Sequence, residues 1–203
     1  MLAAAGLTAT GEITPADRAI HRQMAQSRAQ IIDILHPSKE LIEEKNREGD
    51  CAIILAAKNE LNFGYLIDCL LTKGADKDAK SHLGNSVLWE AIGHFNFEGA
   101  ETLISAGANV NALGHFSTTD PKRTILQLAI KKADPYLIQS ASRNFPSYGE
   151  LAHEVIDLIL RKVTNVDQRG DGGLTAMMVA VMKRRRMDDQ AVTRGWSEYR
   201  LEG

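Results

Sequence analysis

The chain is poor in the residue types that would point to a specialised class of protein. Aromatic residues make up only 5% of its 203 residues, so stacking platforms for nucleic-acid bases are scarce. The formal net charge is -2, from 24 basic and 26 acidic residues, which provides no overall field to attract nucleic acid or an anionic membrane. We therefore expect the main partner to be neither nucleic acid nor a membrane surface.

Cysteines and long apolar runs are also scarce. Cys51 and Cys69 are too few for a disulfide framework in a chain of this size, and both fall within apolar helical patterns. No apolar run approaches the roughly 20 residues of a membrane-spanning helix. The opening stretch, MLAAAGLTATGE, lacks the basic start and the long apolar core of a signal peptide. We expect a protein of a reducing, cytoplasmic compartment that does not insert into a membrane.

The polar residues form no recognisable catalytic or metal-binding pattern. The six histidines are scattered, and the chain contains no H-E-x-x-H or C-x-x-C sequence. The stretch RGDGG at 169–173 lacks the Gly-Lys-Ser/Thr ending of a phosphate-binding loop, so a flexible turn is the simpler interpretation. We predict no catalytic residues, no cofactor, no metal ligands and no enzyme activity.

What the chain does contain is an internal repeat. LLTKGADKDAKS begins at residue 70 and LISAGANVNALG begins at residue 103, which places Gly74 and Gly107 at the same position. Apolar residues at helical spacing precede each glycine, and a glycine can end a helix in the left-handed conformation without steric cost. A pattern that recurs after 33 residues predicts a repeated unit of helices and turns.

A shorter helical pattern follows each polar turn. It reads GDCAIILAA from Gly49, GNSVLWEAI from Gly84, KRTILQLAI from Lys122 and GLTAMMVAV from Gly173. The third position of these stretches holds Cys51, Ser86, Thr124 and Thr175. A Ser or Thr there can cap the helix through its side-chain oxygen. A small residue recurs later in each pattern and allows a neighbouring helix to approach closely, namely Ala56, Ala91, Ala129 and Ala180.

These residues and their order resemble the ankyrin repeat, whose pattern G-x-T-P-L-H-x-A-A is followed by a second helix with L-L and then by G-A-x-V-N. Residues 84–111 match this pattern best, residues 49–78 match it well, and residues 122–167 match with two interruptions. Val163 stands where the last of these copies should have its glycine, so we expect that helix to end differently.

None of the copies has the T-P-L-H of the family. The position of its histidine holds Ile54, Trp89, Gln127 and Met178. We therefore expect the side-chain hydrogen bonds that this histidine makes in the family to be absent.

The resemblance implies an all-α fold, an ankyrin-repeat solenoid of about four to five helix-turn-helix repeats with divergent terminal caps. The approximate repeats are 13–46, 47–80, 81–113, 114–169 and 170–186 onward, between an N-terminal tail at 1–12 and a C-terminal cap or tail at 187–203. In the first repeat we expect one helix to begin at Pro15 and a second to cover AQIIDIL at 29–35. We expect the core to include Ala91, Leu103, Ile104, Ala129, Ile156 and Leu160.

Ankyrin proteins as a family bind other proteins and perform no chemistry themselves. The resemblance therefore implies a non-enzymatic interaction module or scaffold, which we expect to be a monomer. Two alternatives stay open: a targeting module of a larger enzyme, or an effector that an intracellular bacterium delivers into a host cell, with the active part elsewhere. A nucleic-acid binder acting through the basic cluster KRRR at 183–186 is a third, although such a cluster also suits a solvated helix end.

The resemblance places partner binding on the concave side of the array, on two neighbouring turns. The turn from Leu113 to Lys122 is longer than the repeat requires, and Phe116 in it can act as an aromatic anchor. The alternatives are that Phe116 folds back over the adjacent turn and that Trp89 packs inward. The predicted partner-binding residues are Lys77, Lys80, His82, Trp89, His115, Phe116, Asp120 and Lys122.

Two further features carry weaker predictions. LISAGANVN resembles the stretch that an asparaginyl hydroxylase modifies in ankyrin repeats, with Asn111 at the target position. The alternative is that Asn111 hydrogen-bonds the turn, as asparagine commonly does. The stretch 131–150 makes its repeat longer than the others, and it is either a functional loop or a loop that packs onto the fold by itself.

Overall fold

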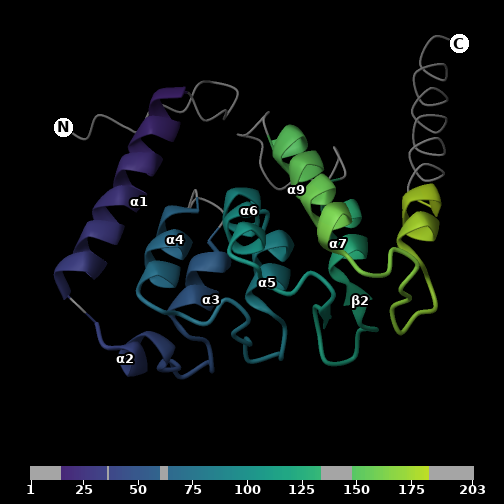
Figure 1. Ribbon diagram of the computed structural model, residues 1–203, viewed down its shortest axis with the longest axis horizontal. Coiled ribbons are helices and arrows are strands. Elements are labelled where there is room, and N and C mark those ends of the chain that lie inside the picture. The colour runs from purple at the N-terminus through teal and green to yellow at the C-terminus, as the bar shows by residue number, and fades with distance from the viewer. Residues whose placement is uncertain (1–14, 36, 60–63, 134–147, 183–203) are drawn as a thin grey trace, which may run out of the picture.

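The computed structural model describes residues 15–35, 37–59, 64–133 and 148–182, and these form an all-α structure (Figure 1). The helices are α1 (Pro15–Leu35), α2 (Lys39–Glu43), α3 (Ala52–Ala57), α4 (Tyr65–Thr72), α5 (Val87–Gly93), α6 (Phe97–Ser105), α7 (Ile125–Lys132) and α9 (Tyr148–Lys162). A further helical segment covers 176–182. The predicted terminal segments 1–12 and 187–203, the basic cluster 183–186 and most of the 131–150 stretch lie outside the described residues.

The helices stack in two layers, as Figure 1 shows. Helices α3, α5 and α7 contact one another in sequence order, while α1, α4, α6 and α9 form the second row. Each helix of the first row also packs against the next helix of the second row, as in the pairs α3–α4, α5–α6 and α7–α9. No such pair could bury its apolar side alone, and stacking against neighbouring pairs produces one continuous core.

The predicted helix starts are confirmed. The Oγ of Ser86 accepts a hydrogen bond from the backbone N of Trp89 at 3.3 Å. Thr124 and Gln127 form a reciprocal capping box at the start of α7. The Oγ1 of Thr175 accepts from the backbone N of Met178 at 3.3 Å, at the start of the last helical segment. These caps depend on residues three apart, which is why the sequence pattern could predict them.

The predicted helix ends are confirmed as well. Gly74 and Gly107 follow α4 and α6 with φ angles of 92° and 83°, in the left-handed region that suits glycine. Helix α9 ends differently, as expected, because Val163 keeps a negative φ and its N–H donates to the carbonyl of Ile159 at 2.8 Å. Among the described residues, Phe95 is the one non-glycine residue with a positive φ, 61°, and it follows α5.

Most of the predicted core is buried, with two exceptions in α9. Four of the six residues, Ala91, Leu103, Ile104 and Ala129, are at most 1% exposed, which confirms them. Ile156 is half-buried and packs against the core, so its prediction is confirmed in part, whereas Leu160 is 42% exposed and its prediction is wrong. The reason is the rotation of α9, which turns Ala152, Val155 and Ile159 toward α6 and α7 and leaves Leu160 facing away.

The first expected repeat is also different. Helix α1 begins at Pro15, as predicted, but runs unbroken for 21 residues through the point where a second helix was expected to start. The segment contains no glycine and no internal proline, and it is rich in Ala, Gln and Arg, which favour a continuous helix. The expectation that a second helix begins within this segment, at 29–35, is therefore wrong: α1 is one continuous helix that packs beside α4, and the short α2 follows it within 13–46.

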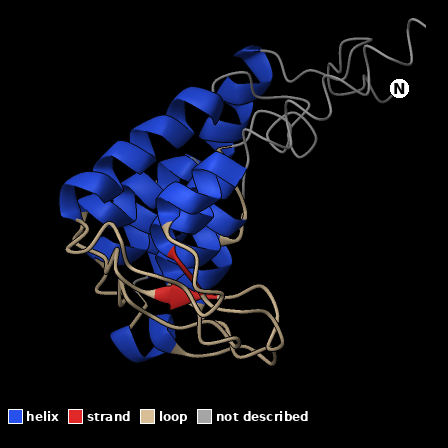
Figure 2. Ribbon diagram, turned by 90° about the vertical axis from the view of Figure 1, so that its right-hand side faces the viewer, coloured by secondary structure: helices blue, strands red, loops and turns tan. Residues whose placement is uncertain are grey.

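Strand structure in the described residues is limited to the long turn. Strands β1 (Leu113–Gly114) and β2 (Arg123–Thr124) pair antiparallel, with Leu113 opposite Thr124 (Figure 2). A single bridge joins Lys80 to Ser86 in the preceding turn. This agrees with the prediction of no substantial sheet. None of the described helices has the length and apolar character that a membrane span requires.

Candidate partner-binding surface

Buried polar side chains join each turn to the next one. The Oδ1 of Asp50 accepts a hydrogen bond from the backbone N of His82 at 3.0 Å. One repeat later, the Oδ1 of Asn85 accepts from the backbone N of His115 at 3.0 Å, and its Nδ2 donates to the carbonyl of His115 at 2.8 Å. Asp50 and Asn85 directly follow the equivalent glycines Gly49 and Gly84, and each is 1% exposed. The same repeat position therefore makes the same connection in successive turns.

A second set of bonds runs along the outer part of the turns. The Oδ1 of Asp78 accepts from the backbone N of Asn109 at 2.8 Å. The Oδ1 of Asn111 accepts from the backbone N of Thr164 at 3.1 Å. Asn111 is half-buried and hydrogen-bonds the turn backbone, as the alternative interpretation proposed. Its hydroxylation stays a prediction, and the two sets of bonds together hold the turns side by side.

The connection continues around Lys122, which stands where the other copies have glycine. The backbone N of Asp171 donates to the carbonyl of Lys122 at 2.8 Å, and the backbone N of Lys122 donates to the Oδ2 of Asp171 at 3.2 Å. Gln127, at the histidine position, hydrogen-bonds the carbonyl of Leu174 through its Nε2. We expected the hydrogen bonds of the family's histidine to be absent; at this position Gln127 makes side-chain hydrogen bonds of its own, because its amide supplies both a donor and an acceptor.

The connection that Asp50 makes to the next turn involves charged groups. The Nζ of Lys58 lies 2.5 Å from the Oδ2 of Asp50, whose side chain is fully buried. Burial by itself would raise the pKa of Asp50, but the hydrogen bonds from Lys58 and from the backbone of His82 outweigh it and hold that pKa below its ordinary value. Asp50 therefore remains an anion at neutral pH, with its Oδ1 accepting from the next turn and its Oδ2 from Lys58.

Beside these turns lies a cluster that we call the lysine–phenylalanine surface, made of Phe95, Phe116, Lys131 and Lys132. Phe116 is 40% exposed, and its ring centroid lies 5.7 Å from that of Trp89, at an angle of 54°. The Nζ atoms of Lys131 and Lys132 lie 5.3 Å and 5.6 Å from the Phe116 centroid. The Nζ of Lys132 also lies 4.0 Å from the centroid of Phe95. At these distances the ring faces attract the ammonium groups.

Two glycines lie against this arrangement, and Gly114 is required for it. A Cβ atom on Gly114 would come within 2.3 Å of the Cδ2 of Trp89, so β1 can cross the indole only without a side chain there. The ring of Phe116 lies 3.9 Å from where a Cβ on Gly93, at the end of α5, would be, which is an ordinary van der Waals distance. Phe116 consequently extends from the long turn along α5 toward the C-terminal ends of α5 and α7, and it rests on Trp89.

Lys132 is the lysine of this surface whose ammonium group lies against both phenylalanine rings. Burial, and then the charge of Lys131, lower the pKa of Lys132 to about 8. Within the described ranges, no carboxylate pairs with its ammonium group, whose recorded contacts are the two phenylalanine rings. A carboxylate of a binding partner could therefore pair with the ammonium group of Lys132, whose charge the two rings compensate only in part.

The structure divides the partner-binding residues predicted from the sequence. Trp89 is only 2% exposed, so its place on the surface is wrong: it lies in the middle helix of the first row, between α3 and α7, and Phe116 covers it. The alternative that Trp89 packs inward is confirmed, and Phe116 is exposed, as predicted, with its ring beside the indole. His115 is half-buried and its Nδ1 lies 2.6 Å from the carbonyl of Ser117.

The remaining predicted residues lie at the turns. Lys80, His82 and Lys122 are exposed, and Lys77 and Asp120 are half-exposed. The Nζ of Lys77 pairs with the Oδ2 of Asp78 at 2.6 Å, within its own turn. No recorded contact among the described residues joins these side chains to Phe116, so they form a flank of the lysine–phenylalanine surface.

The prediction from sequence missed Phe95, Lys131 and Lys132. The Lys-Lys pair was visible directly after the apolar pattern of α7, but it was assigned to the long insertion. A basic pair in the last turn of a helix is a useful signal, because positive charge is favourable at that end. The approach of Phe95 and Phe116 to this pair was not predictable, because the three segments are far apart in the sequence.

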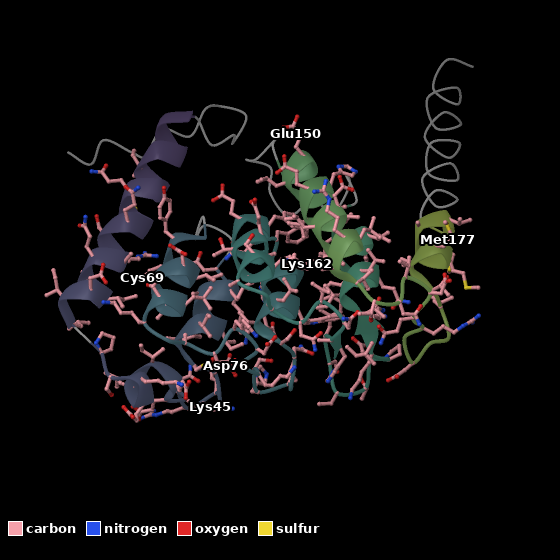
Figure 3. The ribbon with its side chains drawn as sticks, in the orientation of Figure 1. Lys45, Cys69, Asp76, Glu150, Lys162 and Met177 are labelled. Carbon is pink, nitrogen blue, oxygen red and sulfur yellow. The ribbon has the colours of Figure 1, made fainter. Side chains whose placement is uncertain are left out.

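Other chemistry is not supported by side-chain clusters. In the part of the chain that the structure describes, no three His, Cys, Asp or Glu residues lie together as metal ligands would. Cys51 and Cys69 are both buried and free, and Figure 3 shows Cys69 on α4 at the side of α1.

Comparisons with known proteins identified no relative of this chain, so the functional argument rests on the geometry of the surface. No protein-family model matches this chain, and no curated protein sequence matches it.

Proposed function

We propose that the chain is a divergent ankyrin-repeat protein that binds a partner protein and catalyses no reaction. Three observations support the proposal: the stacked helix pairs, the left-handed glycines at Gly74 and Gly107, and the equivalent bonds made by Asp50 and Asn85 between successive turns. Their positions follow the sequence repeat. The free cysteines are compatible with the reducing conditions of the cytoplasm, where we place the protein.

The observation that carries the proposed site is the exposed Phe116 on its rigid support. The ring is 40% exposed, its base is the buried Trp89, and its backbone neighbour His115 is fixed by Asn85. An aromatic side chain that is already ordered loses little conformational freedom on binding, so contact with it is favourable. The lysine–phenylalanine surface is therefore the proposed centre of the interface.

The chemistry of the surface selects a type of partner segment. Phe116 offers an apolar contact, and Lys132 offers a cation that lacks a carboxylate among the described residues. We propose a segment in which an apolar side chain stands next to an Asp, a Glu or a chain-terminal carboxylate. Pairing of that carboxylate with Lys132 would stabilise the ammonium form and raise its pKa from about 8.

The turns at the flank extend the proposed interface. Lys80, His82 and Lys122 are exposed there and can contact the same partner at its edge. Such solvated charges affect the rate of association and its salt dependence more than the affinity. We accordingly expect substitutions at Phe116 and Lys132 to weaken binding more than substitutions at these three residues.

The test is affinity capture with a matched set of baits, followed by quantitative mass spectrometry. Phe116→Ala removes the ring, and Lys132→Met removes the charge while keeping an unbranched apolar stem. Glu101→Ala serves as the control, because Glu101 is exposed on α6, in the other helix row. We expect one captured protein to be lost from the first two baits and kept by the control.

The fold of every bait is checked by circular dichroism and thermal melting, so that lost capture is not confused with unfolding. Equal capture by the wild-type chain and by folded Phe116→Ala and Lys132→Met would place the interface elsewhere. A captured protein is then tested directly for salt-dependent binding, since an ion pair with Lys132 should weaken as salt rises.

We also propose Asn111 as a hydroxylation site, on the resemblance of LISAGANVN. Its amide oxygen is held by Thr164, so the enzyme would need the turn to open locally. Incubation with an asparaginyl hydroxylase should add one oxygen to the peptide that contains Asn111. An unchanged peptide mass contradicts this assignment.

A further inference from the structure

Helix α1 has apolar residues on two opposite sides, and the described part of the chain covers one of them. On the covered side, the Sγ of Cys69 lies 3.7 Å from the carbonyl of Ala29, and Ile32 packs against the core (Figure 3). The Nζ of Lys73 pairs with the Oδ1 of Asp33 at 2.8 Å and fixes the helix to α4. In Figure 1, α1 lies at the edge of the array with α4 beside it.

The uncovered side carries a row of large apolar side chains, which we call the α1 stripe. Its members are Ile20, Met24, Ile31, Ile34 and Leu35, which are 53%, 47%, 55%, 76% and 69% exposed. Ile20, Met24, Ile31 and Ile34 are separated by steps of four, seven and three residues. These are the spacings of the a and d positions of a coiled coil, which lie along one seam of a helix.

The polar residue within the stripe is compatible with burial. Ser27 occupies the remaining a/d position, and its Oγ donates a hydrogen bond to the carbonyl of Gln23 at 2.9 Å. A second helix could therefore cover Ser27 without leaving its hydroxyl group unsatisfied. Serine is also small, which allows the two backbones to approach closely at the centre of the stripe.

The charges around the stripe favour contact with an identical surface. The flanking residues Gln23 and Gln30 are uncharged, and Asp33 is paired with Lys73 on the other side of the helix. Among the α1 side chains that the structure describes, Arg28 is the exposed charged residue beside the stripe. In a parallel a/d arrangement, Arg28 of one copy lies opposite Gln23 of the other, so the two Arg28 charges do not face each other.

We propose that two copies of this chain associate through the α1 stripe, each stripe packing on the other as in a two-stranded coiled coil. The same patch on both copies gives a closed, two-fold contact. Five large side chains at these exposures provide on the order of 500 Å² of apolar surface per copy, or about 1,000 Å² in all, where specific interfaces begin. The dimer is therefore concentration-dependent, and it revises the expectation of a monomer. It is independent of the proposed partner surface, since Phe116 and Lys132 lie in other elements.

Sedimentation velocity of the full chain, from about 1 to about 500 µM, tests the proposal. We expect the mass to rise from 22.3 kDa toward twice that value as concentration increases. The double variant Ile31→Gln/Ile34→Gln should raise the dissociation constant at least about ten-fold, because it removes the middle of the apolar seam. Gln26→Ala is the control: Gln26 is exposed on α1 but outside the stripe, so dimerisation should be unchanged.

Cross-linking provides a second measurement that needs no loss of stability. Ser27→Cys places a thiol at the centre of the stripe, whereas Gln26→Cys places one beside it; the natural Cys51 and Cys69 are buried. A short bis-maleimide should link two copies through position 27 much faster than through position 26. A wild-type chain that stays monomeric at every concentration overturns the proposal and leaves the stripe to a different partner or segment. A dimer that survives Ile31→Gln/Ile34→Gln and cross-links equally at both positions overturns it too.

Discussion

Substitution of Asn85 by alanine should lower the free energy of unfolding more than substitution of an exposed polar residue does. The side chain of Asn85 is 1% exposed and makes three hydrogen bonds. Two of them satisfy the backbone N and O of His115, and the third donates to the Oε1 of Glu90 at 3.1 Å. Alanine leaves all three partners without this contact and creates a small cavity between two turns.

The size of the effect follows from the type and burial of each bond. The two bonds to the partly buried His115 backbone are neutral, and each contributes about 1 kcal/mol. The bond to Glu90, which is 6% exposed, involves a charged acceptor and contributes about 1.5 kcal/mol or more. Glu90 keeps its 2.7 Å hydrogen bond from Ser81, and water can reach part of the turn. We therefore expect a loss of about 3 kcal/mol in the free energy of unfolding.

Urea denaturation followed by circular dichroism measures this loss. Asn109→Ala is the matched control, because the Oδ1 of Asn109 accepts one local bond, from the N of Asn111 at 2.9 Å, at an exposed site. It should cost less than about 1 kcal/mol. His115→Ala should also have a small effect, since the connection uses the backbone of His115 and not its ring. A loss below about 1 kcal/mol for Asn85→Ala, or one equal to that of Asn109→Ala, would refute the reasoning.

Three further predictions concern the core and the lysine–phenylalanine surface. Gly114→Ala should lower stability by about 1–3 kcal/mol, because its Cβ would meet Trp89, whereas Gly172→Ala, with open space around it, should leave the thermal midpoint unchanged. Leu103→Asp should abolish the cooperative thermal transition, because Leu103 is fully buried and an unpaired charge cannot be accommodated there; a folded variant contradicts this. The pKa of Lys132 is lowered to about 8 from 10.5, so between these pH values the unfolded chain binds more protons and stability should rise with pH. Lys132→Met should flatten that rise in urea denaturation at pH 8 and 10.5, and an identical slope in both proteins counts against the lowered pKa.

The predictions that held rest on interactions within one or two turns of chain. Ser86 and Thr124 cap helices through residues three positions later, and Gly107 ends α6 by its own conformational freedom. The burial of Leu103 and Ala91 followed from the repeat, since equivalent positions face the stacked neighbours on both sides. In the interior of the array, where every unit has two neighbours, sequence pattern and packing therefore agree.

At the ends of the array the pattern was insufficient. The same kind of apolar residue is buried at Ile104 but 42% exposed at Leu160, because the rotation of α9 against α6 and α7 decides which side is covered. Helix α1 was divided in two on the strength of the repeat, although its own helix-forming residues continue across the expected break. The helix propensity of its own residues determined the length of α1. In the described structure no helix covers the outer side of α1, so the α1 stripe is exposed.

In the central units, the sequence by itself determined the helix boundaries, the repeat period and the inward-facing residues, since short-range bonds and apolar periodicity specify these features. Only the tertiary structure decided that Trp89 is buried, that Phe116 lies over it, and that Lys132 meets both Phe95 and Phe116. These contacts join three segments that are distant in the chain, and their geometry depends on how closely α5 and α7 approach. Side-chain periodicity specifies which face of a helix turns inward, but not which distant side chain will cover the edge of that face.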